Sequence, residues 1–180
     1  MTDNLRIEII RANQISAELG KQIDALDHLA FSGQIHHDPD FGSIRWASHD
    51  WMVLGHLGSE LVTQLCLLKR EITVSEAKVW VAGIGGVATH PNWRQRGLAS
   101  QLLRASEAFI QTEIRTPFSL LICADETQPI YAHCGWQTVA KSLTFIQDSQ
   151  RRRLETCVMI LSLINQPWPA GEINLCGLPW

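Results

Sequence analysis

The sequence lacks several features that would place it in a specialised class of protein. It has no apolar run approaching the length that spans a bilayer, and its first ten residues, MTDNLRIEII, are too polar for a secretory signal. Its 15 basic and 18 acidic residues give a net charge of -3, so it has no general electrostatic attraction to nucleic acid or to an anionic membrane. These absences predict a cytoplasmic protein that binds neither nucleic acid nor membrane.

The cysteines and histidines also lack the spacings that carry metal or redox chemistry. The five cysteines are widely spaced, include no C-x-x-C pair and have mostly apolar neighbours, which favours reduced core residues. The motif HHDPD at residues 36–40 offers metal-binding side chains, but a polar loop explains the same composition. We therefore expect no metal cofactor.

The composition is that of one globular domain. Of the 180 residues, 46% are hydrophobic and 18% are charged, enough apolar residues to bury a core. No linker, internal repeat or low-complexity segment divides the chain. The sequence predicts a single domain over residues 1–180, and a homodimer is compatible with it.

The first half of the sequence predicts one helix and four strands. Residues 5–12 alternate as a strand, and Ser16 caps a helix over residues 17–31, where apolar residues recur at helical spacing. Residues 32–50 are rich in turn formers and predict a loop with a short helix. Residues 51–74 predict a hairpin with its turn near Gly58-Ser59, and residues 78–90 add a further antiparallel strand.

The second half predicts helices on a continuing sheet. A helix begins at Leu98 and ends before Pro117, and a buried strand follows at residues 118–124. A short helix closed by Gly135 precedes strands at residues 137–146 and 157–163. The order of elements predicts an α+β fold with a mixed, mostly antiparallel sheet of about seven strands flanked by helices.

The junction between residues 90 and 100 has the features of an anion site. It joins the end of a central strand to the start of the longest helix, where backbone N–H groups lack intrahelical partners. Such a helix start attracts phosphate, Gly97 allows close approach of the backbone, and Arg94 and Arg96 add positive charge. The spacing matches neither a nucleotide P-loop nor a dinucleotide fingerprint. An ordinary solvated turn accounts for the same residues when they are taken alone.

The string Arg94-x-x-Gly97-x-Ala99 after a strand resembles the acetyl-CoA signature of the GNAT N-acetyltransferases. Downstream, Tyr131 followed by Gly135-Trp136 is similar to a second pattern of this superfamily. The resemblance implies a GNAT-like fold with splayed central strands and acetyl-CoA as co-substrate. It also implies a set of cofactor-binding residues, with the pantetheine arm along the first three and the pyrophosphate at the others: Val87, Ala88, Thr89, Arg94, Gln95, Arg96, Gly97, Leu98, Ala99 and Ser100.

The resemblance implies transfer of the acetyl group to a primary amine of a small molecule, with Tyr131 as proton donor to the CoA sulfur. The alternative for Tyr131 is packing against Trp136. The strand glutamate that many members carry is absent, and Gly85-Gly86 stand in that region. His90, a chain of ordered waters, or the acids Asp125 and Glu126 remain as candidate bases. A CoA-binding sensor or structural module without turnover is the alternative function.

The tail WPAGEINLCGLPW is similar to the C-terminus of aminoglycoside 2'-N-acetyltransferases, which makes an aminoglycoside-like acceptor one expectation. Leu178-Pro179 stand where those enzymes carry an aspartate. The alternative for Trp180 is a hydrophobic plug that docks the tail. Carboxylates expected to serve a polycationic acceptor are those of Asp38, Asp40, Asp50, Glu60, Asp125, Glu126 and Trp180.

Overall fold

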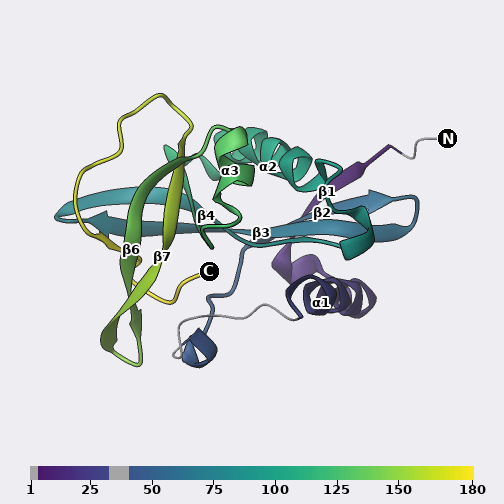
Figure 1. The fold of residues 1–180 in the computed structure, drawn as a ribbon, viewed down its shortest axis with the longest axis horizontal. Coiled ribbons are helices and arrows are strands. Elements are labelled where there is room, and N and C mark those ends of the chain that lie inside the picture. Colours follow the sequence, from purple (N-terminus) through teal and green to yellow (C-terminus); the bar gives the residue numbers. More distant parts are fainter. Residues whose placement is uncertain (1–3, 33–40) are drawn as a thin grey trace.

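The protein is built on one mixed sheet of eight strands (Figure 1). The computed structural model describes residues 4–32 and 41–180, so the motif at residues 36–40, with Asp38 and Asp40, lies outside the described residues. The strand order is β1-β2-β3-β4-β5-β7-β6-β8, and only the β4–β5 and β6–β8 pairs are parallel. The strands are β1 (Arg6–Arg11), β2 (Trp51–Leu57), β3 (Glu60–Val74), β4 (Ala77–Thr89), β5 (Phe118–Cys123), β6 (Gln137–Gln147), β7 (Gln150–Ser162) and β8 (Ile173–Asn174).

Helices cover both faces of this sheet. Figure 1 shows α1 (Ala17–Phe31) on one side of the sheet, and α2 (Leu98–Phe109) with α3 (Gln128–His133) on the other. The α2 helix continues into a π-helical turn, Ile110–Ile114, and three short 3₁₀ turns lie at Ala12–Gln14, Phe41–Ser43 and Pro91–Trp93. No helix in the described part of the chain is long and apolar enough to cross a membrane.

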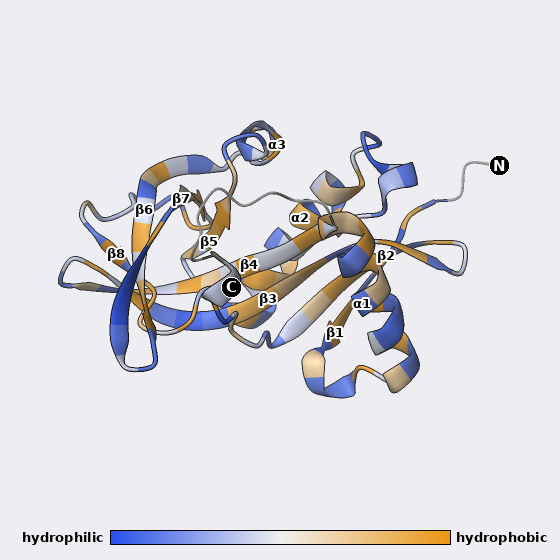
Figure 2. Ribbon diagram, turned by 60° about the horizontal axis from the view of Figure 1, so that its bottom comes forward, coloured by the Kyte–Doolittle hydropathy of each residue, from blue (hydrophilic) through white to orange (hydrophobic). Residues whose placement is uncertain are grey.

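The alternation of side chains along the strands separates the two faces. On β2, Met52 and Leu54 pack with the buried side of α1, whereas Val53 packs with Leu102 of α2. The same separation orients β4, where Ala88 belongs to the α1 side and Val87 packs on the α2 side. Figure 2 shows apolar colouring along the central strands, between the helices.

Ser16 caps α1 as the sequence predicts, because its Oγ accepts a hydrogen bond from the Leu19 amide at 3.2 Å. We expect Ser16→Ala to lower the free energy of unfolding by about 1 kcal/mol, since the amide then has only water as a partner. Denaturant unfolding measures the change. Ser32→Ala is the control, because Ser32 lies at the other end of α1 and its hydroxyl makes only a 3.5 Å contact with the Leu29 carbonyl. An equal loss in both variants would contradict the cap.

The central strands β4 and β5 diverge. Their parallel pairing ends where Ile84 meets Leu121, yet β4 continues to Thr89 and β5 to Cys123. Beyond Ile84, β4 is paired to β3 on one side and has no strand partner on the other among the described residues. The expected splay of the central strands is therefore confirmed. It leaves one edge of β4, after Ile84, without hydrogen bonds to a neighbouring strand.

Gly85 and Gly86 form a β-bulge in β4. Gln64 of β3 pairs with Ala88 and Cys66 pairs with Gly85, so β4 contains one more residue than β3 in this interval. Gly86 has a φ of +55°, a conformation that favours glycine. A side chain on Gly85 would meet the main-chain carbon of Trp180 at 2.8 Å. The first glycine thus makes room for the tail and the second forms the bulge.

The C-terminal half of the sheet differs in detail from the sequence-based expectation. β7 begins at Gln150, seven residues before the expected start at residue 157, because the polar run QRRRLET lies in a hairpin with β6. A two-residue strand, β8, adds an eighth strand and pairs with both β6 and β3, so this half of the sheet curls back on itself. The cysteines are free, but Cys176 is exposed, and its assignment to the core was wrong.

Candidate active site

The turn between β4 and α2 presents a row of unpaired backbone donors. Gln95 and Gly97 both have positive φ, +61° and +72°, which turns the chain sharply before Leu98. Within the described ranges, the backbone N–H groups from Gln95 to Ser100 have no hydrogen-bond acceptor, and Gln101 is the first to donate, to the Gly97 carbonyl at 3.1 Å. Six consecutive donors are therefore free, and the last four of them, those of Gly97 to Ser100, lie at the positive end of the helix dipole.

The two arginines of this turn have different surroundings. The Arg94 guanidinium donates to the Thr89 carbonyl at 3.3 Å and to the Ala30 carbonyl at 2.9 Å, so it ties the end of α1 to the end of β4. Arg96 lies over the Trp93 ring, 4.6 Å from its centroid, and is exposed. Arg94 thus has a bracing role that its sequence motif did not indicate, while Arg96 remains open to solvent.

The unpaired edge of β4 leads directly to this turn. The side chains of Val87 and Ala88 are taken up by packing on the two faces of the sheet, and the Thr89 hydroxyl lies 3.0 Å from that of Thr63. These three side chains contact other residues of the protein and are not available to a ligand. Only main-chain groups on the β5 side of residues 85–89 are left to bind an extended ligand, in the manner of an added strand.

Tyr131 of α3 has a buried ring and an unpaired hydroxyl. The residue is 9% exposed, and its ring meets Trp136 edge-on at a centroid distance of 6.4 Å. Its hydroxyl forms no hydrogen bond to any residue that the structure describes, yet the oxygen is not among the fully enclosed polar atoms. Burial, and secondarily the Cys123 and Cys134 thiols, raises the pKa of Tyr131 well above its ordinary value. The phenol therefore keeps its proton and retains a free donor.

The candidate bases and acceptor carboxylates expected from the sequence have different surroundings. His90 Nδ1 accepts the Asn92 amide at 3.2 Å and so caps the short turn that follows β4. Asp125 is exposed and pairs with Lys141 Nζ at 2.6 Å, and Glu126 is exposed beside it. Asp50 Oδ2 accepts the Lys69 amide of β3 at 2.8 Å, just before the start of β2. Glu60 lies in the tip of the β2–β3 hairpin.

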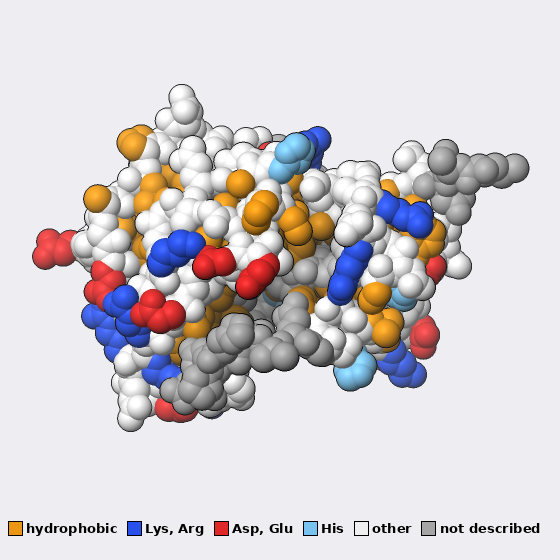
Figure 3. All heavy atoms as spheres, viewed as in Figure 1, with side chains coloured by type: hydrophobic (Ala, Val, Ile, Leu, Met, Phe, Trp, Pro, Cys, Tyr) orange, Lys and Arg blue, Asp and Glu red, His pale blue; other side chains and the backbone are white. Residues whose placement is uncertain are grey.

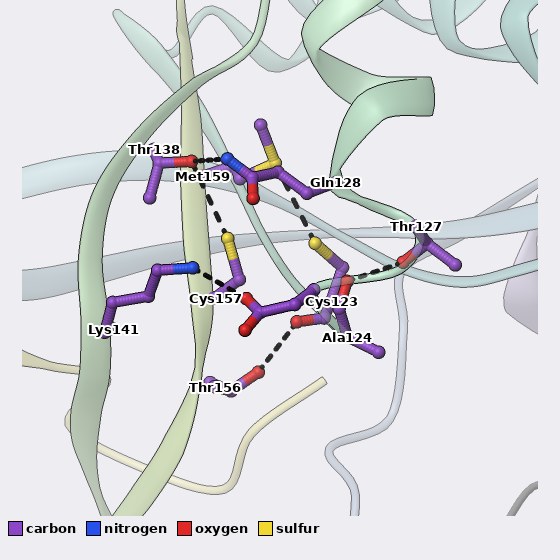
Figure 4. A network of polar contacts seen from close by, with 10 residues as sticks. Cys123, Ala124, Thr127, Gln128, Thr138, Lys141, Thr156, Cys157 and Met159 are labelled. Carbon is purple, nitrogen blue, oxygen red and sulfur yellow. Dashed lines mark hydrogen bonds and ion pairs between the residues drawn. The ribbon is translucent and has the colours of Figure 1, made fainter.

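Sulfur groups lie close together where β5 ends (Figure 4). Cys123 and Cys157 are direct partners across β5 and β7, and Cys123 Sγ contacts Met159 Sδ at 3.8 Å. Burial, followed by the neighbouring Cys157, raises the pKa of the Cys123 thiol to about 12. The Cys123 thiol is therefore protonated, and both cysteines pack on the Tyr131 side of the sheet, as expected for reduced core cysteines.

The tail lies against the opposite face of β4. The Trp180 indole is 6% exposed, its Nε1 donates to the Leu120 carbonyl at 3.3 Å, and the Arg70 guanidinium lies 5.1 Å from the ring centroid. Trp180 is thus a docked plug beside the splay. Figure 3 shows a hollow between the two halves of the molecule on this view, bordered by acidic side chains on one side and a basic one on the other.

Asp27 is an acidic group near the splay that the sequence reasoning missed. It lies on α1, is half-buried, and accepts a hydrogen bond from Gln64 Nε2 at 2.7 Å. Burial raises its pKa, opposed in part by the Gln64 hydrogen bond. A signal was present in the sequence, because Asp27 follows Ile23 by four residues and precedes Ala30 by three, which places a carboxylate on the apolar face of the helix.

Residues 16–139 match a family model described as an acetyltransferase (GNAT) domain. The match covers more than half of the chain, and the protein therefore belongs to the GNAT acetyltransferase family. No curated protein matches the sequence.

Solved structures share the fold at low sequence identity. Escherichia coli ElaA is 17% identical with a TM-score of 0.60, over 87% of this chain and 99% of its own. A GNAT family acetyltransferase from Brucella melitensis, solved in complex with acetyl-CoA, is 12% identical with a TM-score of 0.62, over 95% of each chain. Eis1 from Mycobacterium abscessus is 15% identical with a TM-score of 0.58, over 78% of this chain but 32% of its own.

Proposed function

We propose that the protein transfers the acetyl group of acetyl-CoA to a primary amine of a small molecule, by direct attack in a ternary complex. The observation that carries this proposal is the row of six unpaired amides from Gln95 to Ser100, placed at the end of an unpaired β4 edge. An amide row at a helix start suits a diphosphate, and an open strand edge suits the amide-containing pantetheine arm. Membership of the acetyltransferase family and the acetyl-CoA complex of a structural neighbour support the same assignment.

The residues around the turn fit acetyl-CoA. In this proposal, the amides of Arg96 to Ser100, with that of Gln95, hold the pyrophosphate, and the exposed Arg96 contributes charge. Gly97 supplies the positive φ that aligns these amides. Main-chain groups of Val87 to Thr89 hold the pantetheine arm. Arg94 acts by bracing the turn against α1, because its guanidinium is occupied by two carbonyls.

Acetyl-CoA supplies an activated thioester, and residues of the protein must accept one proton and donate another. The acceptor ammonium has to lose one proton before attack, and the departing thiolate has to gain one. Tyr131 is the proton donor in this proposal, because its hydroxyl has no partner among the described residues and is not fully enclosed. The β4 amides at the bulge can polarise the thioester carbonyl.

Release of free thiol from acetyl-CoA tests this function. The purified protein is incubated with acetyl-CoA and a panel of primary amines that includes an aminoglycoside, a polyamine and single amino acids. Thiol release that depends on one amine, with a mass increase of one acetyl group on that amine, supports the enzyme. Binding of CoA without turnover on any amine would instead favour a sensor or structural module.

An aminoglycoside-like acceptor remains a proposal within this panel. The tail segment lies beside the splay, and this placement supports an influence on the acceptor. Asp50, just before β2, and Glu60, at the hairpin tip, are engaged or placed away from the bulge. These two carboxylates would therefore not serve a sugar with several ammonium groups, and we expect smaller amines to be turned over at least as well.

Replacing Gly97 with valine should raise the KM for acetyl-CoA about tenfold or more, because a β-branched residue does not hold a φ near +72° and the amides would lose their alignment. Gly58→Val is a matched control: Gly58 has a φ of +59° in the β2–β3 turn, and neither position has an atom within 4 Å of an added Cβ. Both variants should lose similar unfolding free energy. Equal KM values in the two variants would refute the phosphate-binding assignment.

A further inference from the structure

The α1 face of the β4 bulge carries polar groups that the proposed mechanism has not used. Gln64 and Cys66 of β3 flank the bulge, opposite Ala88 and Gly85 respectively. Cys66 Sγ would lie 3.4 Å from a Cβ on Gly85, so it faces the bulge directly. Burial raises the pKa of Cys66 to about 11, and the thiol is therefore neutral at physiological pH. The remaining polar group on this face is Gln64, and its role depends on the residue to which it donates a hydrogen bond.

Gln64 orients the Asp27 carboxylate. The Gln64 amide nitrogen donates to Asp27 Oδ1 at 2.7 Å and lies 3.4 Å from the Ile23 carbonyl, so two acceptors fix which end of the amide faces α1. Gln64 is 1% exposed, and this buried amide gives the carboxylate a rigid support. Asp27 is thereby held beside the bulge and within one helical turn of Ala30, whose carbonyl Arg94 ties to the end of β4.

Asp27 forms no ion pair within the described part of the chain, although His49 lies close enough to favour its ionised form. None of the ion pairs there includes it, and its only hydrogen bond uses Oδ1. A half-buried carboxylate without a cation is costly for a fold to keep, and such groups concentrate at functional sites. A ligand ammonium would supply the missing charge.

Asp27 and Tyr131 lie on opposite faces of the sheet at the splay. Gln64 and Asp27 are on the α1 side, whereas Tyr131 packs in the cluster on the α2 side with Cys123 and Leu102. The open β4 edge between them is where the proposed thioester would bind. This arrangement separates a proton acceptor on the side of amine attack from a proton donor on the side of the sulfur.

We propose that Asp27 is the acid of the acceptor site, which binds the acceptor ammonium and takes the proton that it loses. The inference rests on the proposed acetyltransferase function. One N–H bond of the ammonium breaks and its proton passes to the Asp27 carboxylate; the amine nitrogen then forms the new C–N bond as the C–S bond breaks. The departing thiolate takes the Tyr131 proton, the N-protonated amide then loses its second N–H proton to the Tyr131 phenolate, and Asp27 releases its proton to solvent. Asp27 thus replaces, from α1, the acid that β4 lacks.

Several charged or titratable groups surround Asp27. Asp24 on α1 disfavours its ionised form, and His49, from the segment before β2, favours it, while Cys66 on β3 is neutral. Because burial outweighs these effects, the pKa of Asp27 lies above its usual value. The acid limb of kcat/KM should accordingly fall at a higher pH than an exposed aspartate would give.

The test is Asp27→Asn, measured with the amine that the wild-type protein acetylates. Asparagine keeps the shape and can still accept the Gln64 hydrogen bond, so the fold should be retained. We expect kcat/KM for the amine to fall about 10- to 100-fold, with KM for acetyl-CoA within about twofold, as for loss of one charged hydrogen bond. Asp24→Asn removes the same charge from an exposed site one turn away and is the matched control.

The outcomes separate this inference from the function on which it rests. If Asp27→Asn alone loses amine turnover and its acid limb, and keeps its thermal midpoint, Asp27 acts as proposed. If the wild type turns over and both aspartate variants match it, Asp27 only anchors α1 and the inference is wrong. If the wild type acetylates no amine, the proposed function fails. Uncharged analogues, such as the corresponding alcohol, should bind equally well to wild type and Asp27→Asn; a tenfold loss there would contradict ammonium recognition.

Discussion

Replacing Tyr131 with phenylalanine is expected to lower kcat about 100- to 10,000-fold, the range typical of a lost general acid. The change removes only the hydroxyl, and the ring can keep its edge-on contact with Trp136 at 6.4 Å. Because the hydroxyl has no hydrogen-bond partner among the described residues, its loss should not lower stability. Acetyl-CoA should bind with unchanged KM, since the proposed cofactor contacts are main-chain groups of β4 and of the turn before α2.

Ser119→Ala is the control for this substitution. The Ser119 hydroxyl is also without a partner and lies on β5, so its removal tests whether loss of an unpaired hydroxyl in the sheet affects turnover. Thiol release should be unchanged in Ser119→Ala and strongly reduced in Tyr131→Phe, with both thermal midpoints close to wild type. If Tyr131→Phe retains full kcat, the tyrosine serves only to pack against Trp136, and the proton must come from elsewhere.

Local patterns in the sequence were enough to predict the framework around this site. Ser16 and the apolar spacing of residues 17–31 predicted α1, and Gly58-Ser59 predicted the β2–β3 turn. Gly97 at a strand-to-helix junction predicted the amide row, because positive φ and unpaired helix N–H groups depend on residues next to one another in the chain. Properties of this kind are encoded locally, and so a single sequence reveals them.

Features that depend on distant contacts were not predicted. Asp27 becomes a candidate site residue only through its hydrogen bond with Gln64, which is 37 residues away in sequence. The contact of Arg94 with phosphate stays a prediction, but its hydrogen bond to the Ala30 carbonyl, 64 residues away, could not be read from the sequence. The start of β7 was missed because Arg151, Arg152 and Arg153 obscure the strand pattern, although Arg151 pairs with Glu172 at 2.9 Å. In each case a partner on another element decides the role of the residue.

The docking of Trp180 on β4 leads to the second large expected effect. Trp180→Ala should lower the free energy of unfolding by about 3 kcal/mol, as for other buried tryptophans, because the indole packs on Gly83 and bonds the Leu120 carbonyl. Gly83→Ala should also destabilise the protein, since an added Cβ would lie 2.3 Å from Trp180 Cε2. Denaturant unfolding of the single and double variants measures both effects.

The two substitutions should be strongly non-additive, because the clash at Gly83 exists only while the indole is present. In the Trp180→Ala background, Gly83→Ala should cost little, and the double variant should be about as stable as Trp180→Ala alone. Additive losses would mean that Gly83 is needed for the backbone of β4 and not for the tail. The coupling matters for the site, because the main chain of Trp180 approaches Gly85 at the bulge. Without the indole that anchors the tail on Gly83, the tail beside the bulge should be held less firmly, and larger amines should gain in kcat/KM relative to smaller ones.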